Sequence, residues 1–146
     1  MTTIAYKDGL IAYDSQVTRG DIITDDAYEK CIEQKGVKFF CAGPVSDHQR
    51  LVDVYFGAKP EGNIDASALV VDGESLMHVA VDDTTGLWKT PILQTRVYAI
   101  GSGSPFAFAA MDMGAGACKA IEMAAKRDTN TGGTIRTVII GQAKAG

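Results

Sequence analysis

Residues 2–18 have the sequence TTIAYKDGLIAYDSQVT, which contains two short runs of β-prone residues. The runs at 2–6 and 10–14 are joined by a Lys-Asp-Gly turn, which has the length and composition of a hairpin connection. In the second run the residues on both faces are apolar, a pattern typical of a strand that is covered on both sides. This stretch predicts a buried hairpin within a layered fold.

The rest of the chain alternates between β-prone runs and helical patterns. Ser46 followed by Gln49 forms a capping box at the start of a short helix that Gly57 ends. Ser104 as N-cap and Pro105 in the first turn begin a longer helical segment, which two later glycines divide into two helices. Together they predict an α/β (α+β) fold, a four-layer sandwich. Further strands are expected at residues 28–34, 37–42, 68–71, 76–81, 97–100 and 135–140.

Length and composition place the chain among ordinary globular domains. Its 146 residues correspond to one domain, 1–146, with 46% hydrophobic and 22% charged residues. The formal net charge is −4 and the basic residues are scattered, so nucleic acid is not an expected partner. No apolar stretch approaches the ~20 residues of a membrane helix, and no secretory signal is recognisable. We therefore expect no membrane partner and a cytoplasmic location.

Cofactor motifs are missing from the sequence. Cys31, Cys41 and Cys118 are widely spaced, and no histidine stands at zinc-ligand spacing from them. Gly101 and Gly103 lack the third glycine of a dinucleotide fingerprint, and the chain has no P-loop motif. We therefore expect neither a metal nor another cofactor.

Thr2 has a chemical property that the other threonines lack. Methionine before a small residue is usually removed in cells, and removal of Met1 leaves Thr2 with a hydroxyl and a free α-amine. The reference pKa of an α-amine is about 7.7–8.0, so one residue then carries a nucleophile and a base. Taken alone, Thr2 is more simply interpreted as the start of a strand, and only its surroundings in the sequence can favour the catalytic interpretation.

Five short blocks follow one another along nearly the whole chain. Each block alone is weak, but their order resembles that of the proteasome β-subunit family and its bacterial HslV-type relative, the N-terminal nucleophile hydrolases. The blocks are Thr2-Thr3-Ile4 with Asp14-Ser15-Gln16-Val17-Thr18, then Lys30-Cys31-Ile32, Ala42-Gly43 followed by Asp47, Gly101-Ser102-Gly103, and Arg127-Asp128 followed by Thr131-Gly132-Gly133.

The resemblance implies a threonine-type peptidase with the four-layer αββα sandwich of that family. Thr2 would be the nucleophile that attacks a peptide carbonyl. Lys30 would stabilise the alkoxide of Thr2, and Asp14 would hold the Lys30 ammonium by charge-assisted hydrogen bonds. Gly43 would donate its backbone N–H to the oxyanion.

The resemblance also implies a set of supporting residues. The family commonly has serine at the position of Thr131, so the hydroxyl is kept and a methyl group is added. The residues that would orient the Thr2 amine and the attacking water are Ser102, Asp128 and Thr131. Thr18 and Gly43 would flank an extended peptide substrate that is added as a strand. Cys41 and Val45 would shape the pocket for the substrate residue before the cut.

The expected partners also come from the resemblance. They are a peptide or unfolded polypeptide substrate, further copies of the chain in a ring, and an ATPase unfoldase. Apolar residues around the helix that begins near Ser104 also predict a homo-oligomer: Phe106, Phe108, Met111 and Met113.

The sequence departs from the family pattern at residues 58–63, where turn formers replace a second long helix. One helix of the first helical layer, which contributes to ring contacts in the family, is therefore expected to be missing. Two alternatives to the peptidase stay open. One is a catalytically silent assembly or shell subunit, and the other is an amidase that acts on a small molecule with the same fold.

Overall fold

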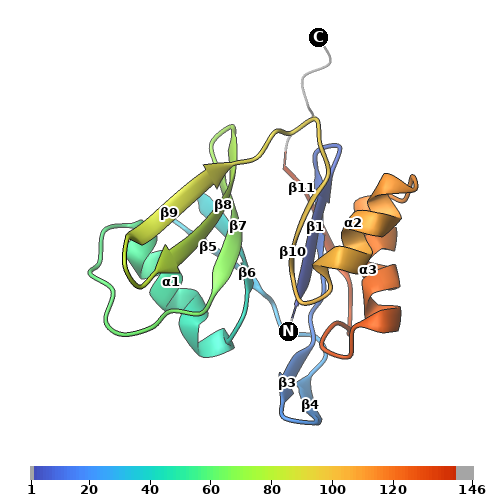
Figure 1. Ribbon diagram of the computed structural model, residues 1–146, viewed down its shortest axis with the longest axis horizontal. Coiled ribbons are helices and arrows are strands. Elements are labelled where there is room, and N and C mark those ends of the chain that lie inside the picture. Colours follow the sequence, from blue (N-terminus) through green and yellow to red (C-terminus); the bar gives the residue numbers. More distant parts are fainter. Residues whose placement is uncertain (1, 141–146) are drawn as a thin grey trace. The chain divides into compact units, whose positions relative to one another are not determined.

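The computed structural model describes residues 2–140, which form two compact units (Figure 1). Within the described residues, unit 1 comprises 2–30 and 93–140, whereas unit 2 comprises Cys31–Ile92. Each unit contains one larger antiparallel sheet with helical structure packed on it. Among the described residues there are three α-helices, none of which is long and apolar enough to span a membrane.

Unit 1 is built on a four-stranded sheet. Its strands are β1 (Thr3–Lys7), β2 (Leu10–Tyr13), β10 (Tyr98–Gly101) and β11 (Arg136–Ile139). They are ordered β10-β1-β2-β11, and all neighbours are antiparallel. The hairpin expected near the start of the chain is thus formed by β1 and β2, and its turn holds Asp8 and Gly9 at positive φ.

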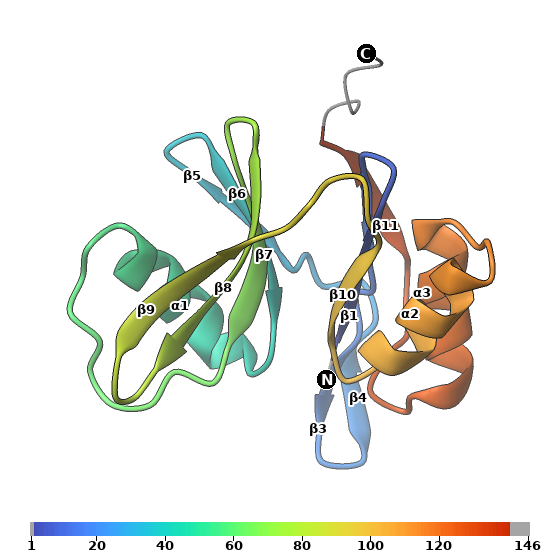
Figure 2. The same ribbon diagram turned by 45° about the horizontal axis from the view of Figure 1, so that its top comes forward.

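Two helices, α2 (Ser104–Asp112) and α3 (Ala117–Arg127), cover one face of this sheet (Figures 1 and 2). Ala5 of β1 lies opposite both Ala12 of β2 and Ala99 of β10. This row of small side chains lets the helices approach the sheet closely. The helices contribute the other buried residues of this core: Ala107, Met111, Ala117, Ala120 and Ile121.

The expected division of the helical segment into two helices is confirmed, but the expected cap is wrong. Gly103, not Ser104, occupies the N-cap position of α2, and no side chain accepts a capping hydrogen bond there. Pro105 lies in the first turn, as expected, where its missing N–H costs nothing.

A second, short hairpin in unit 1 was not predicted. It consists of β3 (Val17–Arg19) and β4 (Ile22–Asp25). All four residues of β4 are exposed, so the sequence carries no alternation of buried and exposed positions that could have revealed it.

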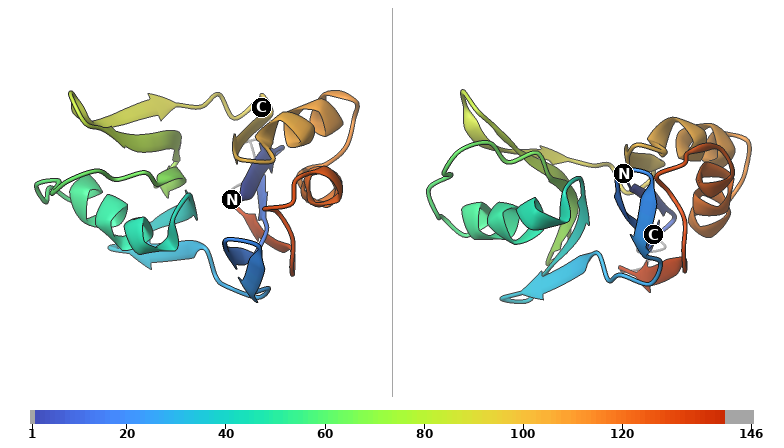
Figure 3. Two further views of the ribbon diagram at one scale, coloured as in Figure 1. Left: turned by 60° about the horizontal axis from the view of Figure 1, so that its bottom comes forward. Right: turned by 90° about the horizontal axis from the view of Figure 1, so that it is seen from below.

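Unit 2 is a five-stranded antiparallel sheet with one helix. The strands are β5 (Cys31–Gln34), β6 (Val37–Ala42), β7 (Ser67–Asp72), β8 (Ser75–Asp82) and β9 (Gly86–Pro91), ordered β5-β6-β7-β8-β9. A single 3-10 turn (Val45–Asp47) leads into α1 (His48–Tyr55), which lies against one face of this sheet (Figure 3).

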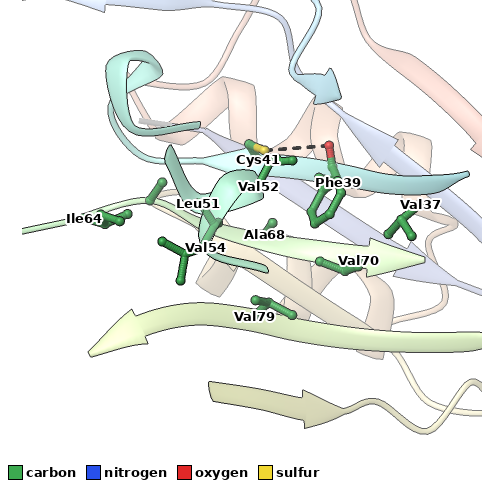
Figure 4. Close-up of a cluster of buried hydrophobic side chains, with 11 residues drawn as sticks. Val37, Phe39, Cys41, Leu51, Val52, Val54, Ile64, Ala68, Val70 and Val79 are labelled. Carbon is green, nitrogen blue, oxygen red and sulfur yellow. Dashed lines mark hydrogen bonds between the residues drawn. The ribbon is translucent and has the colours of Figure 1, made fainter. Parts of the chain in front are cut away.

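The core of unit 2 lies between α1 and its sheet (Figure 4). Leu51 and Val52 of the helix are fully buried against alternate residues of β6, β7 and β8. The residues that these strands contribute are Val37, Phe39, Cys41, Ala68, Val70 and Val79. This alternation is the one expected of strands with a single face towards a helix.

Three details of unit 2 differ from the expectations. The strand expected from residue 28 begins at Cys31, and β9 was not predicted. Ser46 does not cap α1: the N-cap position belongs to Asp47, which makes no side-chain capping bond. Its carboxylate instead accepts hydrogen bonds from the Arg50 side chain and the Asp65 N–H.

The helix expected to be missing is indeed replaced by a loop, since residues 57–66 contain no helix. Arg50 donates hydrogen bonds to the carbonyl oxygens of Glu61 and Asn63 in this loop. These bonds, together with the burial of Ile64 and Ala66 in the core of unit 2, hold the loop in place.

Candidate active site

Several segments of unit 1 reach the same edge of its sheet. Thr2 directly precedes β1, while Asp14 and Ser102 directly follow β2 and β10, which are the two antiparallel neighbours of β1. The start of β1 therefore lies beside the ends of both neighbours. The loop that precedes β11 comes to this edge as well, because β11 runs antiparallel to β2. Antiparallel pairing thus gathers polar residues that are far apart in the sequence.

Lys30 joins Thr2 to Asp14 at this edge. Its Nζ donates a hydrogen bond to Thr2 Oγ1 at 2.8 Å and another to Asp14 Oδ1 at 2.9 Å. All three residues are almost completely buried, with Lys30 1% and Asp14 0% exposed. The structure therefore brings the three residues expected to carry the chemistry into direct contact.

The carboxylate of Asp14 is held by the backbone as well. Oδ1 accepts the N–H of Thr3 at 3.2 Å, and Oδ2 accepts the N–H of Gly132 at 3.0 Å. Together with Lys30, these donors satisfy both oxygens of a buried carboxylate. Asp14 is consequently fixed in position before any substrate binds.

A second hydrogen-bonded group lies on the amide side of Thr2. The Thr2 nitrogen donates to Ser102 Oγ at 3.2 Å. Ser102 Oγ and Thr131 Oγ1 each donate to the same oxygen, Asp128 Oδ2, at 2.6 Å. Ser102, Asp128 and Thr131, which were expected to surround the Thr2 amine, are therefore linked to one another and to Thr2.

The directions of these bonds follow from proton counting. A serine hydroxyl has one proton, and Ser102 gives it to the carboxylate of Asp128, so Ser102 presents only lone pairs to the Thr2 nitrogen. Ser102 can therefore accept a hydrogen from that nitrogen but cannot donate one to it. In a free α-amine this leaves the nitrogen lone pair available for another proton.

The ionisable groups respond to these surroundings. Burial lowers the pKa of the Lys30 ammonium, and the charge and hydrogen bond of Asp14 oppose this effect in part. Burial also raises the pKa of Asp128, but hydrogen bonds from Ser102, Thr131 and Asn130 outweigh it and the pKa is lowered overall. Asp128 is thus maintained as a carboxylate by its hydroxyl donors.

The lowered pKa of Asp128 predicts a pH dependence of stability. Its folded-state pKa lies below the unfolded value, about 3.9, so ionised Asp128 contributes stability above that pH that is lost as the pH falls through the folded-state pKa. We expect the free energy of unfolding of Asp128→Asn, measured in urea, to fall less between about pH 5 and 2 than that of the wild type. Parallel curves for the two proteins would show that the hydroxyl bonds contribute nothing. Asp21→Asn, at an exposed position, is the control for loss of one charge.

Two glycines allow this close packing. Gly101, at φ +97°, leaves no room for a side chain, because a Cβ would collide with the backbone carbonyl of Thr2. A Cβ at Gly103 would collide with the hydroxyl of Thr3. Gly101 and Gly103 are therefore required because Thr2 and Thr3 approach their Cα atoms closely, and not only because the chain turns there.

Three further residues expected at the site belong to the other unit. They are Gly43, Cys41 and Val45 of unit 2, whereas Thr2 and the residues hydrogen-bonded around it belong to unit 1. Gly43 has φ +98°, and the ring of His48 donates from Nε2 to its carbonyl oxygen at 3.1 Å. Val45 is partly exposed in the 3-10 turn.

Cys41 requires a correction. Its side chain is fully buried in the core beneath α1, where Sγ donates to the carbonyl oxygen of Phe39. Burial raises the pKa of its thiol to about 12. Cys41 therefore packs the core and offers no surface to a substrate. Thr18 lies on β3, partly exposed, and takes no part in the contacts described above.

Sequence reasoning missed the roles of Thr3 and Gly132. Both bind Asp14 through the backbone, and the Thr3 hydroxyl lies 2.7 Å from that of Thr131. Backbone donors leave no trace in residue type, so no signal could have identified Gly132. Thr3 belongs to one of the short sequence blocks, but nothing in the sequence indicated a role for Thr3 distinct from that of the neighbouring Thr2.

Within residues 2–140, no group of three or more His, Cys, Asp or Glu residues is arranged to hold a metal ion. The hydrogen-bonded cluster around Thr2 itself supplies several reactive side chains. It comprises a threonine hydroxyl, a neighbouring ammonium and two carboxylates held by hydrogen bonds.

Solved structures with similar folds identify the class of architecture. BPH of Thiobacillus denitrificans has a TM-score of 0.69 at 19% identity, with 98% of this chain and 98% of that chain covered. The complex of that BPH with epoxomicin has a TM-score of 0.67 at 18% identity, with 96% and 98% covered. Eukaryotic HslV from Trypanosoma brucei has a TM-score of 0.68 at 21% identity, with 94% of this chain and 97% of that chain covered.

The chain therefore has the mixed α/β fold of these BPH and HslV structures, as the resemblance implied. No protein-family model and no curated protein sequence matches the chain.

Proposed function

We propose that this protein is a threonine-type peptidase in which Thr2, once it is the first residue, is the nucleophile. The observation that carries the proposal is the buried contact of Lys30 Nζ with both Thr2 Oγ1 and Asp14 Oδ1. An unpaired threonine hydroxyl is a weak nucleophile, but an ammonium at 2.8 Å stabilises the alkoxide as it forms. A purely structural ion pair has no need to donate to this hydroxyl.

The first half of the reaction forms an ester. The α-amine of Thr2 takes the hydroxyl proton as Oγ1 bonds to the carbonyl carbon of a peptide, and the carbonyl oxygen becomes an oxyanion. Gly43 is proposed to donate its N–H to this oxyanion, by the sequence resemblance. The protonated amine then gives its proton to the leaving nitrogen, and the peptide bond breaks.

The second half releases the product. A water attacks the ester carbonyl while the α-amine takes one of the water protons. The protonated amine then gives this proton to Thr2 Oγ1 as the ester bond breaks, so a carboxylic acid product leaves and the Thr2 hydroxyl and free amine are restored. Ser102 supports both halves, since its lone pairs face the nitrogen and leave the amine lone pair available. This mechanism requires a free amine, because an amide nitrogen has no basic lone pair.

The mass of the purified protein tests this requirement. We expect mass spectrometry of active material to show a chain that begins at Thr2, because Met1 precedes a small residue. Active protein that retains Met1 would contradict the mechanism. Inactive protein that retains Met1 would instead support the silent assembly subunit, to which the loop at residues 57–66 also points.

We also propose that the chain self-associates, as a ring-forming subunit would. Met111 is buried in the core of unit 1 and is not available to a partner, whereas Phe108 is partly buried against that core. Phe106 is 38% exposed and Met113 is 88% exposed at the two ends of α2, and these apolar side chains remain uncovered in unit 1. Light scattering at micromolar concentration measures the assembly, and docking to an ATPase unfoldase stays a prediction.

A further inference from the structure

Thr3 lies next to the nucleophile on the chain but points to the other face of β1. It is completely buried, and its hydroxyl lies 2.7 Å from that of Thr131. Thr131 gives its only hydroxyl proton to Asp128 Oδ2 at 2.6 Å. The Thr3 hydroxyl must therefore be the donor to Thr131 Oγ1.

Counting the hydroxyl protons shows that every hydrogen bond in this cluster is donated in the direction of Asp128. Thr3 donates to Thr131, and Thr131 donates to Asp128. From the other side, the Thr2 nitrogen donates to Ser102, and Ser102 donates to the same oxygen of Asp128. The two arms thus meet at Asp128 Oδ2, and a change in one arm alters the charge that is left for the other.

Hydrogen bonds in such a chain strengthen one another. A hydroxyl that accepts a bond from Thr3 becomes a better donor, so Thr131 withdraws more charge from Asp128. Less negative charge then remains on Asp128 Oδ2 for Ser102, so the Ser102 oxygen is a weaker acceptor for the Thr2 nitrogen. In the free α-amine this disfavours the protonated form, which cannot act as a base.

The backbone of Thr3 connects to the other half of the site. Its N–H donates to Asp14 Oδ1, the oxygen that also holds Lys30. One residue therefore contacts both the carboxylate of Asp14, which holds the ammonium, and the hydroxyl arm that ends at Asp128 Oδ2. A substitution that removes only the Thr3 hydroxyl abolishes the contact with Thr131 and keeps the backbone N–H bond to Asp14.

We propose that Thr3 is a positioning residue whose hydroxyl, acting through Thr131, Asp128 and Ser102, keeps the α-amine of Thr2 in the unprotonated, base-competent state. The proposal rests on the peptidase function proposed above. Charged groups that neighbour Thr2 in unit 1 are Lys30, Asp14 and Asp128, and a Thr3→Val substitution leaves all of them in place.

The experiment compares Thr3→Val with Thr3→Ser in matured protein. Valine matches threonine in shape and keeps the N–H to Asp14, whereas serine keeps the hydroxyl. For a fluorogenic peptide at neutral pH, we expect Thr3→Val to lower kcat about 3- to 10-fold with little change in KM, the range of one lost hydrogen bond. The acidic limb of its pH–rate profile should move to higher pH. Thr3→Ser should restore both quantities.

Thr137→Val is the matched control. Thr137 is exposed on β11 of the same sheet, where it pairs with Ala12. The same substitution there should leave kcat and the pH profile unchanged. If Thr3→Val also leaves them unchanged, or if Thr3→Ser is as impaired as Thr3→Val, the hydroxyl has no positioning role and the inference is overturned.

A measurement that does not depend on peptide hydrolysis tests this inference independently of the proposed function. The pKa of the Thr2 α-amine can be followed by NMR in matured protein labelled with 15N-threonine. It should be higher in Thr3→Val than in wild type and normal in Thr3→Ser. An inactive wild type would remove the proposed peptidase function, yet the amine pKa would still decide whether Thr3 acts on it. Equal amine pKa values in all three proteins overturn the inference whatever the activity.

Discussion

Replacing Thr2 with alanine is expected to abolish peptide hydrolysis by the matured protein, with a loss of at least about a thousandfold in kcat. Alanine removes the only atom that bonds to the substrate carbonyl in the proposed reaction. Thr2→Ser keeps the hydroxyl and should retain part of the activity. Initial rates with a fluorogenic peptide measure both variants.

Controls for this experiment come from the same chain. Thr90→Ala, at an exposed threonine of β9 in unit 2, should hydrolyse the peptide at the wild-type rate. Mass spectrometry of each variant establishes that its first residue is residue 2. Activity that survives Thr2→Ala would mean that another group carries out the reaction, and the proposed function would be withdrawn.

The second large effect concerns the buried pair of Lys30 and Asp14. Asp14→Asn leaves the Lys30 ammonium, which is 1% exposed, without its carboxylate partner. Removing one partner of a buried ion pair costs about 3–5 kcal/mol in the free energy of unfolding. We expect a loss of this size near neutral pH in urea unfolding, whereas Asp21→Asn, at an exposed aspartate, should leave stability nearly unchanged.

The pH dependence of this loss has a definite sign. Burial lowers the pKa of Lys30, and Asp14 opposes that lowering, so Asp14→Asn should lower the pKa further. The ammonium form then destabilises the folded state at low pH. The deficit should shrink as the pH rises through the folded-state pKa towards the unfolded value of about 10.4. A deficit independent of pH would show that the ammonium is not its cause.

Lys30 itself separates catalysis from structure. Lys30→Ala should lower kcat nearly as much as Thr2→Ala with little change in KM, because the ammonium acts only as the alkoxide forms. Lys30→Arg should not restore activity, since a forked guanidinium cannot take the place of a compact ammonium. A folded Lys30→Ala protein with the wild-type rate would show that the pair with Asp14 is structural.

Local signals in the sequence were sufficient for several elements. The hairpin of β1 and β2 follows from two apolar runs and a Lys-Asp-Gly turn. The break between α2 and α3 follows from Gly114 and Gly116, because Gly114 adopts φ +106° and Gly116 is the N-cap of α3. These features depend on residues close together in the chain, so a single sequence contains them.

Helix caps and exposed strands were less predictable. Ser46 and Ser104 are suitable N-cap residues, but Asp47 and Gly103 occupy the N-cap positions. The carboxylate of Asp47 binds Arg50 and a backbone N–H 18 residues away, a competition that no local pattern reveals. The strands β4 and β9 are largely exposed, so they lack the apolar alternation that predicts a strand.

The sequence by itself, through the order of its short motifs, indicated which reactive residues to consider: Thr2, Asp14, Lys30, Ser102, Asp128 and Thr131. Only the tertiary structure decided which of them touch. Antiparallel pairing of β1 with both β2 and β10 brings segments as much as 100 residues apart to one edge, where Lys30 reaches Thr2 and Asp14. The tertiary structure also decided that the backbone N–H groups of Thr3 and Gly132 donate to Asp14 and that Cys41 lies in the core of unit 2. These outcomes depend on distances through space, and every residue type carries the same backbone N–H except proline.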